Sequence, residues 1–352
     1  MSDLRWALAA VALGLGMLAV GLEAAGYDAG AALGALWSGA FGSWDAFTST
    51  TLVRSVPLIL IGLGLAIAFR AGALNIGAEG QFYAGAIAAT WIGLRVVDQP
   101  APVAIAALLS GAALAGASWV AIPAWLKLRF GVIEVISTLL LNFVAVALVS
   151  LMVQGPLQER GRIYPQSDPI TEAARLPLLP GSRLHAGFVL ALVGALILWA
   201  VFSKTLWGFR LRAVGVGPRA AEISGRIDSQ RIGAMALLLS GAIAGLAGGM
   251  EVSGVSYALF QNLSPGYGFT GIAVALLAGL HPGGVLVAGI LFGALEAGAG
   301  AMQRDAGVPA VAVYVVQAVV IIVALLATVP RDGQLSPRAI LKRRALPPKA
   351  AD

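Results

Sequence analysis

Residues 132–153 read VIEVISTLLLNFVAVALVSLMV, an apolar run of 22 residues with one ionisable side chain, Glu134. A helix needs about 20 mostly apolar residues to cross the hydrocarbon core of a bilayer. Nine further apolar runs are found at 4–23, 52–69, 73–97, 101–126, 186–202, 232–260, 270–280, 285–302 and 310–329. The sequence therefore predicts an all-α polytopic membrane protein with about ten transmembrane helices, some broken or half-spanning.

The composition excludes several other classes of protein. Of 352 residues, 59% are hydrophobic and 11% charged, whereas a soluble domain carries about 25% charged residues. A soluble enzyme and a disordered or fibrous chain are thereby excluded. The chain has no cysteine and two distant histidines, so we expect no disulfide, metal centre or other cofactor. It also has no P-loop and no nucleophile–His–acid set, so we expect no enzymatic activity in this chain.

The positions of Lys and Arg predict the topology. With the N-terminus inside, sixteen of the 23 basic residues fall on cytoplasmic segments, which explains the net charge of +6 without nucleic acid. The seven on the outside are Arg54, Arg95, Arg160, Arg162, Arg175, Arg183 and Arg304. Both termini are then cytoplasmic. Residues 1–330 form one transmembrane domain, with an extracytoplasmic loop at 154–185 and a cytoplasmic loop at 203–231, and residues 331–352 form a basic cytoplasmic tail. We expect the first run to be an uncleaved helix rather than a signal peptide.

Acids and amides stand in or beside the apolar runs, whereas Lys and Arg are missing from the middle of every run. The acids and amides are Asn75, Glu79, Gln81, Glu134, Asn142, Glu251, Glu296 and Gln317. An ionised carboxylate in lipid costs about 2.5–3.5 kcal/mol on insertion scales. The spacing of Asn75 and Glu79, and of Glu134, Thr138 and Asn142, places each set on one helix face. Such side chains either line a path through the protein or join helices and cap their ends; Glu79 could also pair with Arg70.

Two interruptions in the apolar pattern favour a transporter over a structural membrane protein. Residues 75–81 read NIGAEGQ at the start of one run, and residues 281–284 read HPGG between two others. Irregular backbone at membrane depth is tolerated where protein or water covers it, and broken helices are typical of substrate sites. The runs at 270–280 and 285–302 could each cross only partly. The pairs Gly241/Gly245 and Gly289/Gly293 predict close helix packing.

The loop at 203–231 contains a predicted helix of about two turns. Pro218 suits the first turn of a helix and Gly225 its C-terminal end. Such a helix could lie on the lipid surface or dock into a groove of a soluble partner.

Three stretches then carry a family resemblance. Residues 69–81 (FRAGALNIGAEGQ), 131–143 (GVIEVISTLLLNF) and 266–277 (GYGFTGIAVALL) resemble blocks of ABC-importer permeases for nucleosides and simple sugars. These are the basic-membrane-protein-dependent branch of the branched-chain amino acid/ribose-type permease family. The resemblance extends over about residues 50–328. The chain departs from the family at Gly217, where Asn is usual, and at Ile133, where Asn or His is frequent.

The resemblance implies a permease subunit in a bacterial cytoplasmic (inner) membrane, forming the path for nucleosides or simple sugars. ATP hydrolysis would occur on a separate ABC ATPase subunit. A second, related but different permease chain and a substrate-binding lipoprotein or periplasmic protein would complete the importer. It also implies a coupling helix that docks into the ATPase, comprising Gly215, Gly217, Pro218, Arg219, Ala220, Ala221, Glu222 and Gly225.

For the substrate path we expect acids and amides to bind hydroxyl groups and aromatic rings to face a base. The candidates are Asn75, Glu79, Gln81, Glu134, Asn142, Glu251, Tyr257 and Phe260, with Tyr267 and Phe269 as further rings. An interfacial aromatic belt explains the rings equally well. Two other functions remain open: a secondary transporter in which Glu79, Glu251 or Glu296 takes a proton or Na⁺, and a membrane scaffold without transport.

Overall fold

The computed structural model describes residues 2–225 and 227–309, and isolated positions between 311 and 322. As predicted, these residues form helices and no β-strand, apart from two isolated β-bridges. The longer helices are α1 (Ser2–Ala24), α4 (Leu52–Arg70), α6 (Ala101–Phe130), α7 (Glu134–Val153), α8 (Gly187–Lys204), α11 (Ser229–Glu251) and α13 (Pro282–Ala306). The shorter ones are α2 (Ala29–Phe41), α3 (Trp44–Ala46), α5 (Ala78–Gly93), α9 (Leu206–Val216), α10 (Pro218–Gly225) and α12 (Tyr267–Leu277).

Within the described residues, six helices are long and apolar enough to cross a membrane. One of them, Trp44–Arg70, joins α3, the π-helical segment η1 (Phe47–Thr51) and α4 into one continuous helix. Another, Ser229–Ser256, joins α11 to the π-helical segment η3 (Val252–Ser256). The predicted run at 310–329 and the tail at 331–352 lie outside the described residues, apart from isolated positions. The total of ten spans therefore stays a prediction.

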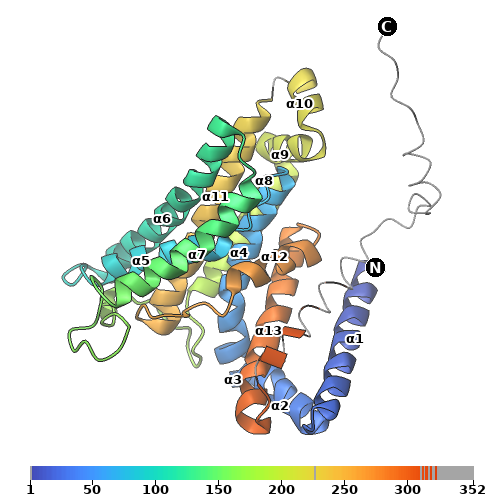
Figure 1. The fold of residues 1–352 in the computed structure, drawn as a ribbon, viewed down its shortest axis with the longest axis vertical. Helices are drawn as coiled ribbons and strands as arrows, with labels where there is room; N and C mark the ends of the chain where they lie inside the picture. Colours follow the sequence, from blue (N-terminus) through green and yellow to red (C-terminus); the bar gives the residue numbers. More distant parts are fainter. Residues whose placement is uncertain are drawn as a thin grey trace.

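The bundle has two distinct ends (Figure 1). At one end, which we call the α10 end, the turn after α4, the α6–α7 turn and the α9–α10 segment line one cavity. At the other, which we call the loop end, the 154–185 segment is hydrogen-bonded to the bundle. Thr171 N donates to Gly93 O at the end of α5, and Ile170 N donates to Tyr257 O. The 154–185 segment and the α9–α10 segment, which were predicted to lie on opposite sides of the membrane, are thus at opposite ends of the bundle. Which end faces the cytoplasm stays a prediction.

The centre of the bundle is packed through glycines of α5, α6 and α11. A Cβ added to Gly85 would lie 2.1 Å from the carbonyl oxygen of Gly245, and one added to Gly245 would lie 2.4 Å from that of Ala112. On α13, Gly289 and Gly293 likewise face the backbone of α4. Both predicted glycine pairs therefore lie at close helix contacts, which only a residue without a side chain permits.

Three elements differ from the sequence-based expectation. The helix α2 was not predicted, because its 13 residues are too few for a membrane span; Asp28, whose side chain accepts from Ala31 N, was its sequence signal. The run at 73–97 is helical only over Ala78–Gly93. The helix α13 is 25 residues long, so it is not a half-span.

Candidate functional site

The chain between α4 and α5 is not helical at residues 73–77. Asn75 lies here, so the prediction that Asn75 and Glu79 share a helix face is wrong. Asn75 is fully buried and forms a reciprocal amide pair with Gln81, with both N···O distances 2.8 Å. Its Nδ2 also donates to Ser240 Oγ on α11, at 2.9 Å. Ser240 is about 16 Å along the helix axis from Ser229, so this break lies near mid-bundle.

The buried face of α7 bonds to the backbone of this break. Asn142 Oδ1 accepts from Gly80 N at 2.8 Å, and Asn142 Nδ2 donates to Ile76 O at 2.9 Å. Thr138 Oγ1 accepts from Ile76 N at 3.3 Å. Irregular backbone in a membrane needs such partners. The predicted stripe of Glu134, Thr138 and Asn142 on one buried face is confirmed, and two of its members act on the backbone.

Glu79 joins two short helices at their N-terminal ends. Its Oε2 accepts from Gly268 N in the first turn of α12, at 2.6 Å. The hydroxyl of Ser264 accepts from Tyr267 N at 2.9 Å in the same turn. A carboxylate at a helix N-terminus satisfies free N–H groups and interacts favourably with the helix dipole. Glu79 is therefore held by α12, and the alternative pairing with Arg70 is wrong.

The two short helices leave this meeting point in opposite directions. α5 runs to the loop end, where Gly93 O accepts from Thr171 N. α12 runs to the α10 end, where Leu280 O, just after the helix, accepts from Arg70 Nε at 3.1 Å. Each helix covers part of the bundle thickness, and each is preceded by non-helical chain. The elements that cross only partly are thus α5 and α12, of which only α12 belongs to a run for which this was expected.

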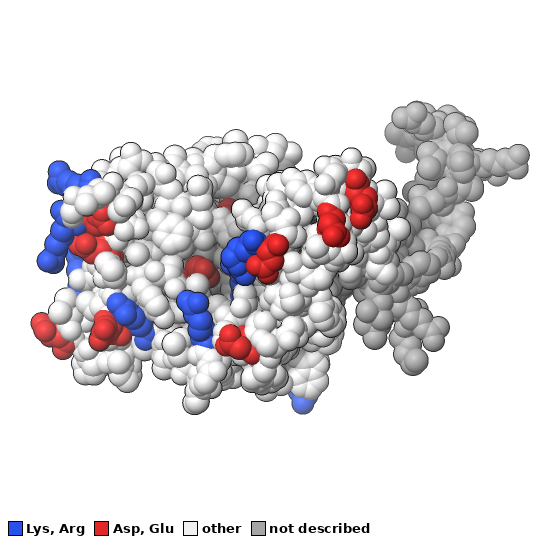
Figure 2. Space-filling model, turned by 90° about the horizontal axis from the view of Figure 1, so that it is seen from below, with Lys and Arg blue, Asp and Glu red and all other residues white. Residues whose placement is uncertain are grey.

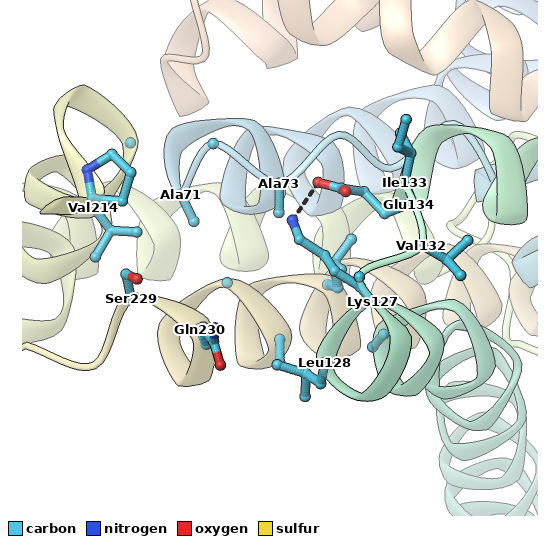
Figure 3. Close-up of a pocket in the computed structure, with 18 residues that line it drawn as sticks. Ala71, Ala73, Lys127, Leu128, Val132, Ile133, Glu134, Val214, Ser229 and Gln230 are labelled. Carbon is cyan, nitrogen blue, oxygen red and sulfur yellow. Dashed lines mark hydrogen bonds and ion pairs between the residues drawn. The ribbon is translucent and has the colours of Figure 1, made fainter.

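Glu134 lies at the α10 end, away from the other acids. Its Oε1 accepts from Lys127 Nζ at 2.5 Å, across the α6–α7 turn. Figure 3 shows this ion pair at a cavity of about 510 Å³, with Ser229 and Gln230 of α11 opposite. Glu134 is therefore paired at an opening of the bundle, and it does not join Glu79 in the interior.

A second charged group lies toward the loop end. Glu251, near the end of the Ser229–Ser256 helix, interacts electrostatically with Arg54. The sequence assigned Arg54 to the outside, at the start of the run at 52–69; the structure places it within the continuous helix that begins at Trp44. The interaction of this arginine with an acid on another helix could have been found only from contacts in space.

The predicted rings are not gathered in one place. Tyr257 and Phe260 belong to the segment after η3. The Arg175 guanidinium lies 4.7 Å from the centre of the Tyr257 ring, and the backbone of Phe260 forms an isolated antiparallel β-bridge with that of Gln166. Tyr267 is buried, with its ring 5.8 Å from that of Phe82, whereas Phe269 is exposed. Whether these rings line the substrate path stays a prediction.

The predicted helix at 218–225 is present as α10. It protrudes at the α10 end (Figure 1). Val216 just before it is 92% exposed and Ile223 is 88% exposed, while Ala221 is buried. Two exposed apolar side chains at the tip of a helical hairpin are suited to a protein partner.

Arg70 and Gly215 connect this hairpin to the break at 73–77. Gly215, at the end of α9, lies so close to α4 that an added Cβ would be 2.0 Å from Arg70 O. The Arg70 guanidinium lies 4.1 Å from the Phe202 ring of α8. A displacement of the α9–α10 hairpin would therefore act on the end of α4 and on the residues that follow it.

No group of three or more Asp, Glu or His side chains that could hold a metal is found in the part of the chain that the structure describes. The arrangement is a helical bundle with an apolar exterior and an interior in which a helix break, acids and amides lie among apolar side chains. This can form a path for a solute, and its protruding hairpin can contact another protein.

Comparisons with known proteins agree with this arrangement. Residues 47–325 match the family described as branched-chain amino acid transport system / permease component. The guanosine ABC transporter permease protein NupP of Bacillus subtilis is 39% identical, over 92% of this chain and 93% of the relative. The glucose ABC transporter permease protein TsgB13 of Haloferax volcanii is 39% identical, over 77% and 74%. The guanosine ABC transporter permease protein NupQ of B. subtilis is 30% identical, over 69% and 78%.

No solved structure matches this chain. The family match, which spans most of the sequence, favours the permease over the secondary transporter and the scaffold. The chain therefore belongs to the family of branched-chain amino acid transport system permease components, and it is a multi-pass membrane protein.

Proposed function

We propose that this chain is a permease subunit of an ABC importer for nucleosides or simple sugars. The observation that carries the proposal is the 39% identity to a guanosine permease over nearly the whole of both chains. The glucose permease at similar identity keeps simple sugars within the proposed range. The bundle lies in a bacterial cytoplasmic membrane, with the α10 end in the cytoplasm.

The α10 helix is the contact with an ABC ATPase subunit. Val216 and Ile223 supply an apolar surface of the kind that fills a groove in a soluble protein. Arg219 and Glu222 are exposed beside them. The Gly215–Arg70 contact then carries movement of the ATPase to the broken segment between α4 and α5.

Two further partners complete the importer. B. subtilis holds two guanosine permease proteins that match this chain at 39% and 30% identity, which supports a second, different permease chain beside this one. A substrate-binding lipoprotein or periplasmic protein delivers the substrate at the loop end. The path for the substrate lies on the side of Glu79 and Glu251. Asn75, Gln81 and Asn142 shape this path through the backbone that they hold.

Co-purification tests the proposal. The tagged chain, expressed with its candidate partners, should recover an ATPase subunit with measurable ATP hydrolysis. Ile223→Asp, Arg219→Glu and Glu222→Arg should each reduce this recovery, because they alter the exposed face of α10. Ile163→Asp changes a similarly exposed isoleucine, 75% exposed at the loop end, and should leave recovery unchanged.

The opposite outcome is equally clear. Recovery of the chain alone, with uptake that stops when the proton or Na⁺ gradient is removed, would overturn the importer and support a secondary transporter.

A further inference from the structure

A pocket near the loop end lies between α5, α7 and the chain that links η3 to α12 (residues 257–266, the linking segment). We call it the Ser150 pocket; its volume is about 200 Å³, and it is lined by Tyr83, Val146, Val149, Ser150, Gln261 and Asn262. Ser150 is 16 residues beyond Glu134 on α7, about 24 Å along the helix axis. The pocket is therefore far from the cavity at the α10 end, and a solute that enters from the loop end can reach it.

The linking segment is held by hydrogen bonds on two sides. Leu259 N donates to Ser167 Oγ at 2.9 Å, and Ser167 N donates to Leu259 O at 2.8 Å. On the other side, Ser264 N donates to the Tyr83 hydroxyl at 3.2 Å. Asn262 has φ 60°, a left-handed conformation that Asn adopts more readily than most residues. The wall of the pocket is thus preformed, as is usual for small-molecule sites.

The polar side chains of the pocket have unused hydrogen-bonding groups. Ser150 Oγ accepts from Gln154 Nε2 and from Gln261 Nε2, at 2.7 Å each. A hydroxyl has two acceptor lone pairs and one donor, so the Ser150 O–H remains free to donate. Gln261 Oε1 and the amide of Asn262 form no hydrogen bond with the residues that the structure describes. The pocket therefore offers a ligand a hydroxyl donor, two amide oxygens and an amide NH₂ group.

The described residues that line the pocket carry no charge. Lys, Arg, Asp and Glu stand at a few separate places on the face seen from the loop end, and most of this face is uncharged (Figure 2). A charged ligand in such a pocket would lose hydration without gaining a counter-charge. The lining therefore favours an uncharged solute that forms hydrogen bonds.

The size of the pocket limits the part of a ligand that it can hold. Sites for whole drug-sized molecules enclose about 300–1,000 Å³, so a pocket of about 200 Å³ suits a single hydroxylated ring. Val146 is 44% exposed, so the pocket is open beside α7 and the remainder of a larger molecule can stay outside. On the basis of the permease function above, we propose that the Ser150 pocket binds the sugar hydroxyls of an uncharged nucleoside or simple sugar that enters from the loop end.

Uptake by the complete importer in proteoliposomes tests this inference. With the same substrate-binding protein in excess, guanosine is compared with 2′,3′-dideoxyguanosine, and glucose with 2-deoxyglucose. In Ser150→Ala and in Gln261→Met the preference for the hydroxylated substrate should fall about three- to tenfold, the effect of losing one hydrogen bond. Gln154→Ala is the matched control, because Gln154 bonds the same Ser150 hydroxyl but does not line the pocket. Its preference should be that of the wild type.

Protection of an introduced thiol gives a second, independent test. The natural chain has no cysteine, so Val146→Cys places the chain's only thiol in the pocket, on a regular part of α7. A small water-soluble methanethiosulfonate reagent should label this thiol in the assembled importer. The transported solute, guanosine or glucose, should slow the labelling in proportion to the occupancy of the pocket. It should not slow the labelling of Ile163→Cys, which is exposed at the loop end outside the pocket.

The outcomes separate this inference from the proposed function. Unchanged preference in both Ser150→Ala and Gln261→Met overturns the inference, and so does labelling of Val146→Cys that the transported solute does not slow. Either result with normal uptake leaves the permease function intact. The two transport variants remove different groups from one pocket, so either suffices if the other fails to assemble. Failure of the wild-type complex to move any of these solutes overturns the proposed function itself.

Discussion

At the scale of single residues, the buried amides bind the protein's own backbone. Asn75, Gln81 and Asn142 are buried and bonded to one another or to main-chain groups at residues 76–80. A side chain used in this way cannot be removed without leaving buried donors and acceptors unpaired. Its substitution should therefore affect folding before it affects substrate.

Asn75→Ala should lower the free energy of unfolding by about 2–4 kcal/mol, because Gln81, Ser240 and Gly77 N each lose a buried partner. Detergent-induced unfolding in mixed micelles measures the change. Gln154→Ala is the control, since its amide bonds Ser150 at an exposed position and its loss should cost little. Wild-type stability of Asn75→Ala, with less uptake per complex, would instead place Asn75 in contact with substrate.

The ionisation of Glu159 makes the stability of the 154–185 loop depend on pH. Its carboxylate accepts from Gln166 Nε2 at 2.8 Å and from Tyr164 N at 2.9 Å. These hydrogen bonds, that from Gln166 foremost, hold the pKa of Glu159 below its usual 4.5. A lowered pKa in the folded state means that the loop has its full stabilisation above pH 4.5 and loses it as the pH falls through the folded pKa.

Hydrogen exchange at the amides of Ile163 and Tyr164 checks this. After correction for intrinsic rates, protection in the wild type should decrease in acid. In Glu159→Gln, protection should be lower near neutral pH and independent of pH over this range. A pH-dependent response retained in the variant would show that another group is responsible.

The sequence predicted correctly which residues share a helix face where the helix is regular. Glu134, Thr138 and Asn142 lie on one face because α7 is unbroken. The same spacing rule failed for Asn75 and Glu79, since the rule assumes a helix and the chain is not helical at Asn75. Arg54 was missed for a different reason: a charge near the end of an apolar run resembles a loop residue until its partners on other helices are known.

At the scale of elements, α5 and α12 meet N-terminus to N-terminus near mid-bundle. Two helix dipoles with their positive ends together are unfavourable unless a negative group lies between them, and Glu79 is that group. The contact is close: a Cβ on Gly268 would lie 2.2 Å from Glu79 N. The position of α12 therefore depends on the absence of a side chain at residue 268.

Gly268→Ala should force α12 away from α5 and lower the free energy of unfolding by about 1–3 kcal/mol, the usual effect of overpacking. It should also reduce uptake per folded complex, because Glu79 loses its partner in α12. Thermal unfolding and transport measured on the same preparation give both values. Gly34→Ala, a helical glycine with no atom near the added Cβ, should be neutral or slightly stabilising. An equal effect at both sites would argue against the close contact.

Some helix ends could be predicted from residues close by in the sequence, whereas others could not. α10 was predicted because Pro218 and Gly225 mark its two ends. α12 was recognised as short because His281 and Pro282 interrupt the apolar pattern directly after the run at 270–280. The polar stretch at 75–81 marked an interruption at the start of the run at 73–97, but the position at which α5 begins depended on long-range bonds from α7 and α11 to residues 75–80, which no local pattern reports.

At the scale of the whole molecule, opposite ends of the bundle present different surfaces. The loop end carries the ordered 154–185 segment, and the α10 end carries the protruding hairpin (Figure 1). The natural sequence contains no cysteine. Any single cysteine introduced at either end is therefore the only thiol in the chain, which allows a direct test of orientation.

Ile163→Cys and Ile223→Cys place that thiol at exposed positions on the two ends. A membrane-impermeant maleimide added to intact cells, after the outer membrane is opened where one exists, should label the first and not the second. Inverted vesicles should give the reverse pattern. Labelling of both variants from one side would contradict the predicted topology, and the exchanged pattern would invert it.

The glycine contacts at the centre of the bundle also constrain how this family can evolve. The obstacle to a side chain at Gly85, Gly116 or Gly245 is a carbonyl oxygen on the facing helix. Every residue type carries that oxygen, so no substitution on the opposite helix can compensate. Contacts between side chains can drift in correlated pairs, but these three positions cannot. In an alignment of relatives they should be invariant and show no covariation, although they are among the closest contacts in the molecule.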